Sequence, residues 1–143
     1  MDDQAPLRDD SREPAAAIHV GLWVAQIMLA VVFGMAGFAK LTTPIPILAE
    51  ELVWPGEFPA AMVRFIGAAE LLGAIGVILP AATRIKPMLT PLAAAGLGLV
   101  MILAGLFHIV RGEFPAIPLN LFLLALAGFV AWGRTKRVVI LGR

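Results

Sequence analysis

Four long hydrophobic runs, separated by short polar segments, organise the amino-acid sequence. They cover Ala15–Ala39, Ala60–Leu79, Met88–Val110 and Ile117–Gly133. Each run is close to the roughly 20 apolar residues with which a helix crosses the hydrocarbon core of a bilayer. None shows the period-two alternation expected of a strand in a membrane barrel. The pattern predicts an all-α, polytopic membrane protein built as a bundle of four transmembrane helices.

The loop between the first two runs has a helical pattern of its own. Ile45, Leu48 and Leu52 recur at helical spacing, and Glu50 and Glu51 fall on another face. The prolines of this loop limit a helix there to about two turns. We expect a short amphipathic helix that lies at the membrane interface in this first outer loop.

The segments at the two ends of the chain are polar and are expected to stay outside the membrane. Residues 1–14 are predicted to form a disordered acidic tail, and residues 134–143 a basic tail, so that the membrane domain covers residues 15–133. The first hydrophobic run is longer than the apolar core of a signal peptide, which has about 7–15 residues, and an acidic segment precedes it. We therefore expect this run to be the first transmembrane helix.

Composition supports a membrane protein and excludes several other classes. Hydrophobic residues make up 60% of the 143 positions and charged residues 15%, whereas an ordinary soluble domain has about 25% charged residues. A net charge of +1 argues against a nucleic-acid-binding protein. Because the chain has no cysteine, it cannot by itself form a disulfide, ligate an iron–sulfur cluster through thiolates or run a thiol relay.

The basic residues are distributed unevenly between the two sides of the predicted bundle. An even number of spans places both termini on one side, together with the loop between the second and third helices. The basic residues of that side are Arg8, Arg12, Arg84, Lys86, Arg134, Lys136, Arg137 and Arg143. The other side carries Lys40 and Arg111, with Arg64 just inside the membrane. Because loops rich in Lys and Arg remain in the cytoplasm, both termini are predicted to be cytoplasmic.

Two ionisable residues, Arg64 and Glu70, lie within the hydrophobic runs. At about 1.5 Å per residue, Arg64 lies about 6 Å and Glu70 about 15 Å from the outer end of the second helix. They are about 120° apart around the helix, so they cannot form an i, i+4 pair. An ionisable group in the membrane needs a partner. We predict that Gln26, at a similar depth in the first helix, is the partner of Glu70.

Further polar residues lie close to the outer ends of the predicted helices. They are Lys40, His108, Glu113 and Asn120. Together with Arg64 and Glu70, they predict one polar cavity that opens to the outer face. The alternative is that most of these side chains reach separately to the interface, as long polar side chains commonly do. Glu70 fits this alternative least, because a short side chain cannot reach water from the middle of the membrane.

The sequence lacks the spacing of the common catalytic and cofactor motifs. It has no GxGxxG, Walker or HExxH pattern, and its only serine, Ser11, lies in the tail. His19 and His108 fall at opposite ends of the predicted bundle, which argues against a haem ligated by both within one chain. His108, Glu113 and Asn120 carry suitable donor atoms for a divalent metal. Their spacing is not a recognised metal motif, however, and we predict no metal site.

Several sequence segments resemble one family of membrane proteins. The first helix ends in GMAGFAKL, the second contains RFIGAAELLGAIGVILP, and PLAAAGLGLVMILAGLFHIVRGE and PLNLFLLALAGFVAWGR follow. Their order and spacing resemble the DoxX family, especially its DoxX-like branch, over Gly21–Arg134. The resemblance implies a four-helix bundle in the cytoplasmic (inner) membrane of a bacterium. On matched positions it points to Lys40, Arg64, Glu70, His108, Glu113 and Asn120.

The resemblance and the polar residues leave three classes of function open. The family includes a subunit of an archaeal thiosulfate:quinone oxidoreductase, which implies an accessory subunit of a redox system with quinone as the candidate cofactor. The small size and the lack of a catalytic set fit instead a binding or assembly protein that recruits another membrane or soluble partner, and a homo-oligomer is a further possibility. Glu70 at mid-depth fits a small proton-coupled transporter. In none of these classes do we expect a self-sufficient enzyme.

Overall fold

The computed structural model describes residues 12–52 and 54–143. The predicted disordered tail lies almost entirely outside these residues. The described part is helical and contains no strand. Its elements are α1 (Arg12–Thr42), α2 (Ile45–Leu52), η1 (Trp54–Gly56), α3 (Ala60–Thr83), α4 (Leu89–Arg111), η2 (Phe114–Ala116) and α5 (Ile117–Lys136). The prediction of an all-α protein with four helices long and apolar enough to span a membrane is confirmed, as is the short helix α2 between the first two.

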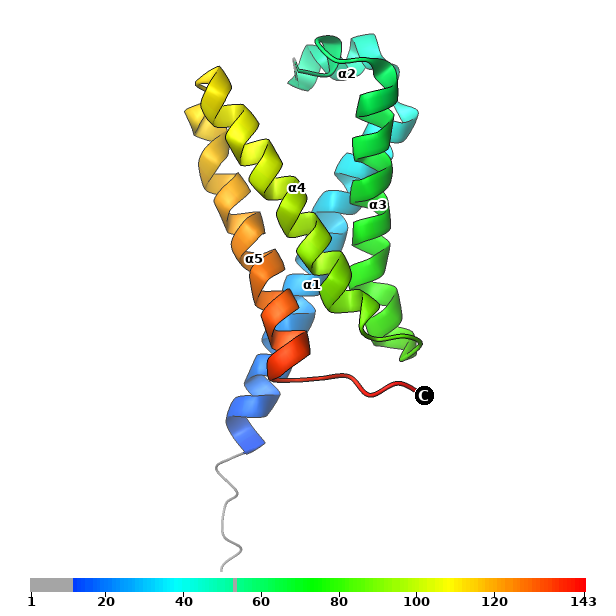
Figure 1. Cartoon of the computed structure of the whole chain (residues 1–143), viewed down its shortest axis with the longest axis vertical. Helices are drawn as coiled ribbons and strands as arrows, with labels where there is room; N and C mark the ends of the chain where they lie inside the picture. Colours follow the sequence, from blue (N-terminus) through cyan, green and yellow to red (C-terminus); the bar gives the residue numbers. More distant parts are fainter. Residues whose placement is uncertain (1–11, 53) are drawn as a thin grey trace, which may run out of the picture.

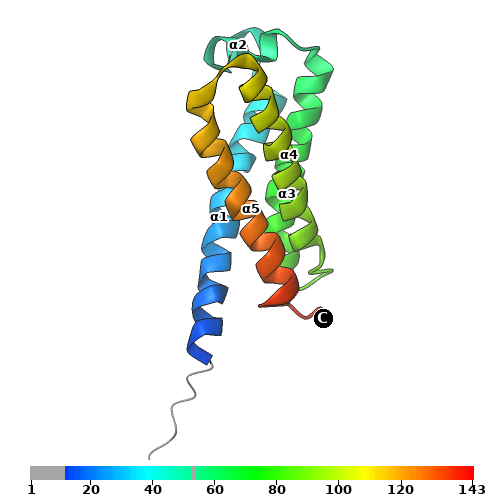
Figure 2. The same ribbon diagram turned by 60° about the vertical axis from the view of Figure 1, so that its left-hand side comes forward.

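The four long helices run side by side, and α2 lies across one end of them (Figures 1 and 2). Consecutive long helices are antiparallel: α1 packs against α3, α3 against α4, and α4 against α5, while α1 also contacts α5. The start of α1 and the C-terminus lie at the opposite end from α2. We call these two ends of the bundle the α2 end and the terminal end.

Small residues bring the long helices close together, as expected in a lipid environment. At the crossing of α1 and α3, a Cβ atom on Gly37 would lie 2.6 Å from the carbonyl oxygen of Gly67. At the contact of α4 and α5, a Cβ on Gly98 would lie 3.7 Å from that of Ala127. Large apolar side chains such as Phe65 and Leu92 are instead exposed on the outside of the bundle. This arrangement fits a surrounding bilayer.

The helices extend beyond the hydrophobic runs that predicted them, and α1 covers Arg12–Thr42 instead of Ala15–Ala39. Pro80 was expected to follow the second transmembrane helix, but α3 continues through it to Thr83. Membrane helices tolerate proline because neighbouring groups can satisfy the freed carbonyl. The last helix likewise continues through Arg134 to Lys136, so the first residues of the predicted basic tail are helical.

Candidate functional site

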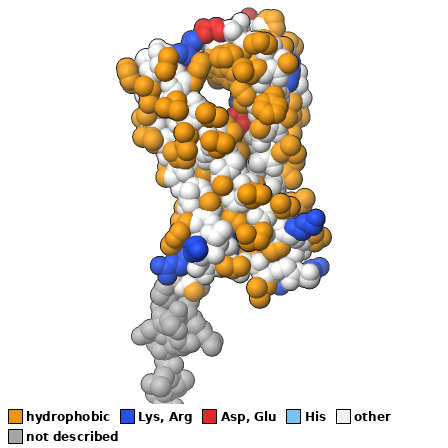
Figure 3. Space-filling model, viewed as in Figure 1, with side chains coloured by type: hydrophobic (Ala, Val, Ile, Leu, Met, Phe, Trp, Pro, Cys, Tyr) orange, Lys and Arg blue, Asp and Glu red, His pale blue; other side chains and the backbone are white. Residues whose placement is uncertain are grey.

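A cavity of about 460 Å³ lies at the α2 end of the bundle. Most of its wall is apolar and comes from α3, α4 and α5, and Trp54 of η1 closes part of it. The space-filling view shows a hollow in this half of the molecule, between α4 and α3 (Figure 3). Four of the predicted site residues line the cavity: Lys40, Glu70, His108 and Asn120. The other two, Arg64 and Glu113, each contact one of these lining residues.

Lys40 and Glu70 form an ion pair inside the bundle. Lys40 Nζ donates a hydrogen bond of 2.8 Å to Glu70 Oε2. The two residues are 7% and 5% exposed, so Lys40 turns inward instead of reaching to the interface. Lys40 lies in the last turn of α1, where the helix dipole favours a cation. Its ammonium group also lies 6.0 Å from the centre of the Trp54 ring, a distance at which a cation is attracted to an aromatic face.

The close crossing of α1 and α3 holds this ion pair in place. A Cβ atom on Gly67 would lie 2.7 Å from Lys40 Cβ and 3.0 Å from the carbonyl oxygen of Gly37. Both distances are too short, so only glycine at position 67 allows the helices to approach this closely. Arg64, one turn before Gly67, donates from Nη1 to the backbone carbonyl of Lys40. The prediction that Arg64 does not pair with Glu70 therefore agrees with the contacts of Arg64 in the structure.

The predicted contact between Gln26 and Glu70 is wrong. Gln26 Oε1 accepts a hydrogen bond of 2.7 Å from Arg134 Nε, and its Nε2 donates to the carbonyl of Val77. Counted from the α2 end, Gln26 lies about 24 Å along α1, whereas Glu70 lies about 15 Å along α3. The prediction missed this difference because α1 extends past the hydrophobic run, to Thr42.

Gln26 and Arg134 form a second buried polar cluster, toward the terminal end. Arg134 is only 2% exposed, and its guanidinium carbon lies 5.2 Å from the centre of the Trp23 ring. From the sequence, Arg134 is expected to begin the basic tail. A signal was present, however, because Leu123, Ala127, Val130 and Arg134 recur at helical spacing and are all buried. Gln26 thereby connects α1 to both α3 and α5.

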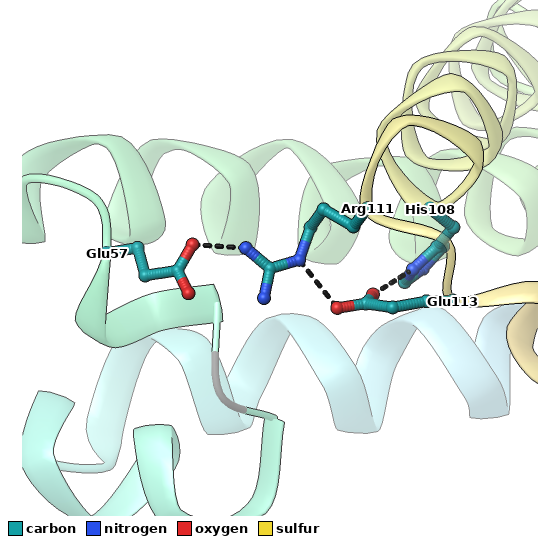
Figure 4. A network of polar contacts seen from close by, with 4 residues as sticks. All are labelled: Glu57, His108, Arg111 and Glu113. Atoms are coloured by element: carbon teal, nitrogen blue, oxygen red, sulfur yellow. Dashed lines mark hydrogen bonds and ion pairs between the residues drawn. The ribbon is translucent and has the colours of Figure 1, made fainter.

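Charged residues at the α2 end connect the segment before α3 to the end of α4 (Figure 4). Arg111 donates from Nε to Glu113 Oε1 at 2.5 Å and from Nη1 to Glu57. His108 Nδ1 lies 2.7 Å from the other carboxylate oxygen of Glu113. Arg111, and after it His108, hold the pKa of the Glu113 carboxyl below its ordinary value of 4.5. Glu57 was not among the predicted site residues, because it lies in a loop and no periodic pattern marks it.

The contact with Glu113 determines what the His108 ring can offer to a ligand. A carboxylate only accepts hydrogen bonds, so Nδ1 carries the proton that it shares with Glu113. In the neutral ring, Nε2 is then an acceptor. His108 lines the cavity, so its ring adds a polar group to the wall formed by α4, and Nε2 is the acceptor when the ring is neutral.

Asn120 is the polar residue of the cavity that has the weakest partner. It is 7% exposed, and its Nδ2 donates to the sulfur of Met101 at 3.5 Å. A thioether is a weak acceptor, so the amide can still form a stronger hydrogen bond. Its Oδ1 packs against Gly105 of α4, where a Cβ atom would lie 2.7 Å away. The glycine thus leaves room for the amide at the wall of the cavity.

Three aromatic rings line the same cavity. Trp54, Phe58 and Phe107 lie with ring centres 5.6 to 6.4 Å apart, at edge-to-face or tilted angles. They connect the η1 segment to α4 and give the cavity flat apolar surfaces. Among the described residues, no group of three His, Asp or Glu side chains is placed to hold a metal ion. Cavities with mostly apolar walls and a few polar groups are the usual form of small-molecule sites in proteins.

Comparison with known protein families agrees with the fold. The model of the DoxX-like family matches residues 24–130, from the first long helix into the last. This range includes all six polar residues predicted for the site. Neither the curated proteins nor the solved structures contain a match to the chain. With three quarters of its length covered by the family model, the chain belongs to the DoxX-like family and is an integral membrane protein.

Proposed function

We propose that this DoxX-like protein is an accessory subunit of a quinone-linked redox system and that its cavity binds the quinone ring. The observation that carries the proposal is that polar groups from two pairs of helices line one largely apolar cavity. Lys40 and Glu70 come from α1 and α3, and His108 and Asn120 come from α4 and α5. A quinone ring carries two carbonyl groups on opposite sides, which this arrangement can address together.

The four polar residues offer hydrogen bonds to both redox states of such a ring. The ammonium group of Lys40 and the amide of Asn120 donate, and quinone carbonyls accept. The carboxylate of Glu70 and Nε2 of His108 accept, and the hydroxyl groups of a quinol donate. The aromatic rings of Trp54 and Phe107 supply stacking surfaces for the ring itself.

The chain is proposed as an accessory subunit because its own residues do not carry electrons onward. It has no cysteine to ligate an iron–sulfur cluster or to form a redox disulfide. Electrons would therefore pass to or from a redox partner in the same membrane, and this chain would bind and orient the quinone.

We further propose a bacterial cytoplasmic membrane as the location, with both termini in the cytoplasm. The terminal end carries the excess of Lys and Arg, including Arg84, Lys86, Arg134 and Arg137, which favours that side as cytoplasmic. The cavity and α2 would then lie in the outer half of the membrane.

Tryptophan fluorescence tests quinone binding, because quinones quench an indole that they contact. The chain has three tryptophans, and Trp54 lines the cavity. The variant Trp23→Phe/Trp132→Phe keeps Trp54 as its single reporter. We expect a benzoquinone without a hydrocarbon tail to quench the fluorescence of Trp54 along a saturable binding curve. Asn120→Leu is expected to weaken this binding.

The matched control is Trp23→Phe/Trp54→Phe, which keeps Trp132 on the outside of the bundle. We expect the fluorescence of Trp132 in this control to be quenched in proportion to the benzoquinone concentration, without saturation, by quinone dissolved in the detergent. Identical curves for the two reporters would contradict a ring site in the cavity.

A further inference from the structure

A second hollow, of about 520 Å³, continues from the cavity along the contact between α3 and α4. The two hollows share Ala69 and Val100 as lining residues. From there the second one follows α3 as far as Pro80 and α4 back to Leu89, toward the terminal end. Eleven residues of helix correspond to a length of about 16 Å. We call this second hollow the α3–α4 groove.

The side chains that line the α3–α4 groove are all apolar, and small residues shape the groove. All of its lining side chains are hydrocarbon, apart from glycines that have none. Its floor is closed, because a Cβ atom on Gly76 would lie 2.6 Å from Ala93 Cβ. Its rim is formed by exposed side chains, among them Leu72 and Leu92. The groove is therefore open to the surroundings along its length, and no polar side chain lines it.

We infer that the two hollows together bind one long-chain amphiphile, with its polar ring in the cavity and its apolar chain in the α3–α4 groove. This inference rests on the proposed function, and it narrows the ligand to a quinone with a long chain. The continuity at Ala69 and Val100 lets one molecule occupy both hollows. The chain would run from the polar residues at the α2 end into the middle of the membrane, where a long apolar chain belongs.

The contacts around the cavity leave the ligand a path from the bilayer between α3 and α4. At the α2 end, the loop before α3 is connected to α4 in two ways. The rings of Trp54 and Phe58 pack against Phe107, and Arg111 contacts Glu57. The exposed side chains of Met62 and Phe65 instead border the cavity on its outer side. A ligand dissolved in lipid can therefore enter sideways between α3 and α4, with its chain following along the groove.

Two glycines offer a matched pair of variants. A Cβ atom on Gly96, which lines the α3–α4 groove, would have no atom within 4 Å, and the same holds for Gly128, which lies on α5 outside both hollows. Leucine at either position adds the same side chain to an exposed helix surface. Gly96→Leu fills the groove, whereas Gly128→Leu does not. Partitioning of a probe into detergent is the same for both variants.

Photolabelling in purified full-length protein tests the inference. The probes are a benzoquinone that carries a diazirine on the ring and a benzoquinone with a decyl chain that ends in a diazirine. We expect the ring probe to label the cavity in the unmodified protein and in both variants. We expect the chain-end probe to label the α3–α4 groove in the unmodified protein and in Gly128→Leu, and to lose about fivefold or more of this labelling in Gly96→Leu, because packed contacts of several methylene groups are lost.

The outcomes separate the inference from the proposed function. Ring labelling in the cavity, combined with chain-end labelling spread over the whole lipid-facing surface, would overturn the inference and leave the proposed function standing. Equal chain-end labelling of the groove in Gly96→Leu and Gly128→Leu would overturn it as well. Absence of ring labelling from the cavity would overturn both. Labelling of the unmodified protein does not depend on how well either variant folds.

Discussion

Lys40 Nζ lies 2.8 Å from Glu70 Oε2, so the last turn of α1 and the middle of α3 are joined by an ion pair that is almost fully buried. Two opposite charges in an apolar surrounding satisfy each other, but either one alone is strongly unfavourable there. The pair thus fixes a charged and hydrogen-bonding group at the wall of the cavity.

Removing one partner of this ion pair is expected to destabilise the protein more than removing both. Glu70→Leu or Lys40→Met alone leaves an uncompensated buried charge and should cost about 3 kcal/mol or more. The double variant should recover most of that loss. A double-mutant cycle, measured by reversible unfolding in detergent or bicelles, checks this. Additive effects of the two substitutions would show that the side chains do not interact.

Gly67→Ala is expected to destabilise the bundle, because its methyl group would meet both Lys40 Cβ and the carbonyl of Gly37. Overpacking of this kind typically costs about 1–3 kcal/mol. Gly96→Ala is the matched control, since its methyl group would have no atom within 4 Å. Thermal unfolding of the two variants compares them directly. Equal stability would contradict the close crossing of α1 and α3.

Gln26→Leu is expected to destabilise the terminal half of the bundle. The substitution removes the acceptor of Arg134 Nε and the donor to the Val77 carbonyl, and an unsatisfied buried polar group costs about 1–3 kcal/mol. Thr135→Val serves as a control, because Thr135 is exposed and bonds only to backbone of its own helix. If Gln26→Leu unfolds at the same temperature as this control, Gln26 does not join α1 to α3 and α5.

Glu113 is expected to stabilise the α2 end at neutral pH and to lose this effect in acid. Its carboxyl pKa is lower in the folded protein than the ordinary 4.5, because Arg111 and His108 favour the carboxylate. The stabilisation is therefore complete above about pH 4.5 and disappears as the pH falls through the folded-state pKa.

The difference in unfolding temperature between the unmodified protein and Glu113→Gln measures this effect across pH. A difference that grows on acidification would contradict the predicted direction.

The orientation of the chain can be tested with single cysteines, because the sequence contains none. A membrane-impermeant maleimide added to intact cells should label Glu50→Cys, which lies on α2, and should not label Lys86→Cys, between α3 and α4. Labelling of Lys86→Cys instead of Glu50→Cys would place the α2 end in the cytoplasm.

Hydropathy predicted the long helices because each of them must be apolar over about 20 residues, whatever its neighbours are. The amphipathic spacing of Ile45, Leu48 and Leu52 likewise predicted α2 from local sequence. Local patterns do not specify which residues of different helices meet. Gly37 and Gly67 are two glycines among fourteen, and nothing in their local sequence shows that they meet at a close helix crossing.

For the polar residues, too, the place in the bundle could be predicted from the sequence, but the contacts between helices could not. Lys40, His108 and Asn120 were expected around one cavity because they lie near the outer helix ends, and Glu70 because it is ionisable within the membrane. All four line the cavity. Their pairing was harder to predict, because depth counted from the ends of hydrophobic runs is accurate only to a few residues. That error assigned Glu70 to Gln26 instead of Lys40.

The central claim, that the cavity binds a quinone, is tested most directly by mass spectrometry of what copurifies from the native membrane. The protein is extracted gently beside His108→Phe, in the cavity, and the matched variant His19→Phe, at the terminal end. We predict about one long-chain quinone per unmodified chain and per His19→Phe chain, and much less in His108→Phe. Bulk phospholipid alone, or equal quinone in all three preparations, would contradict the claim.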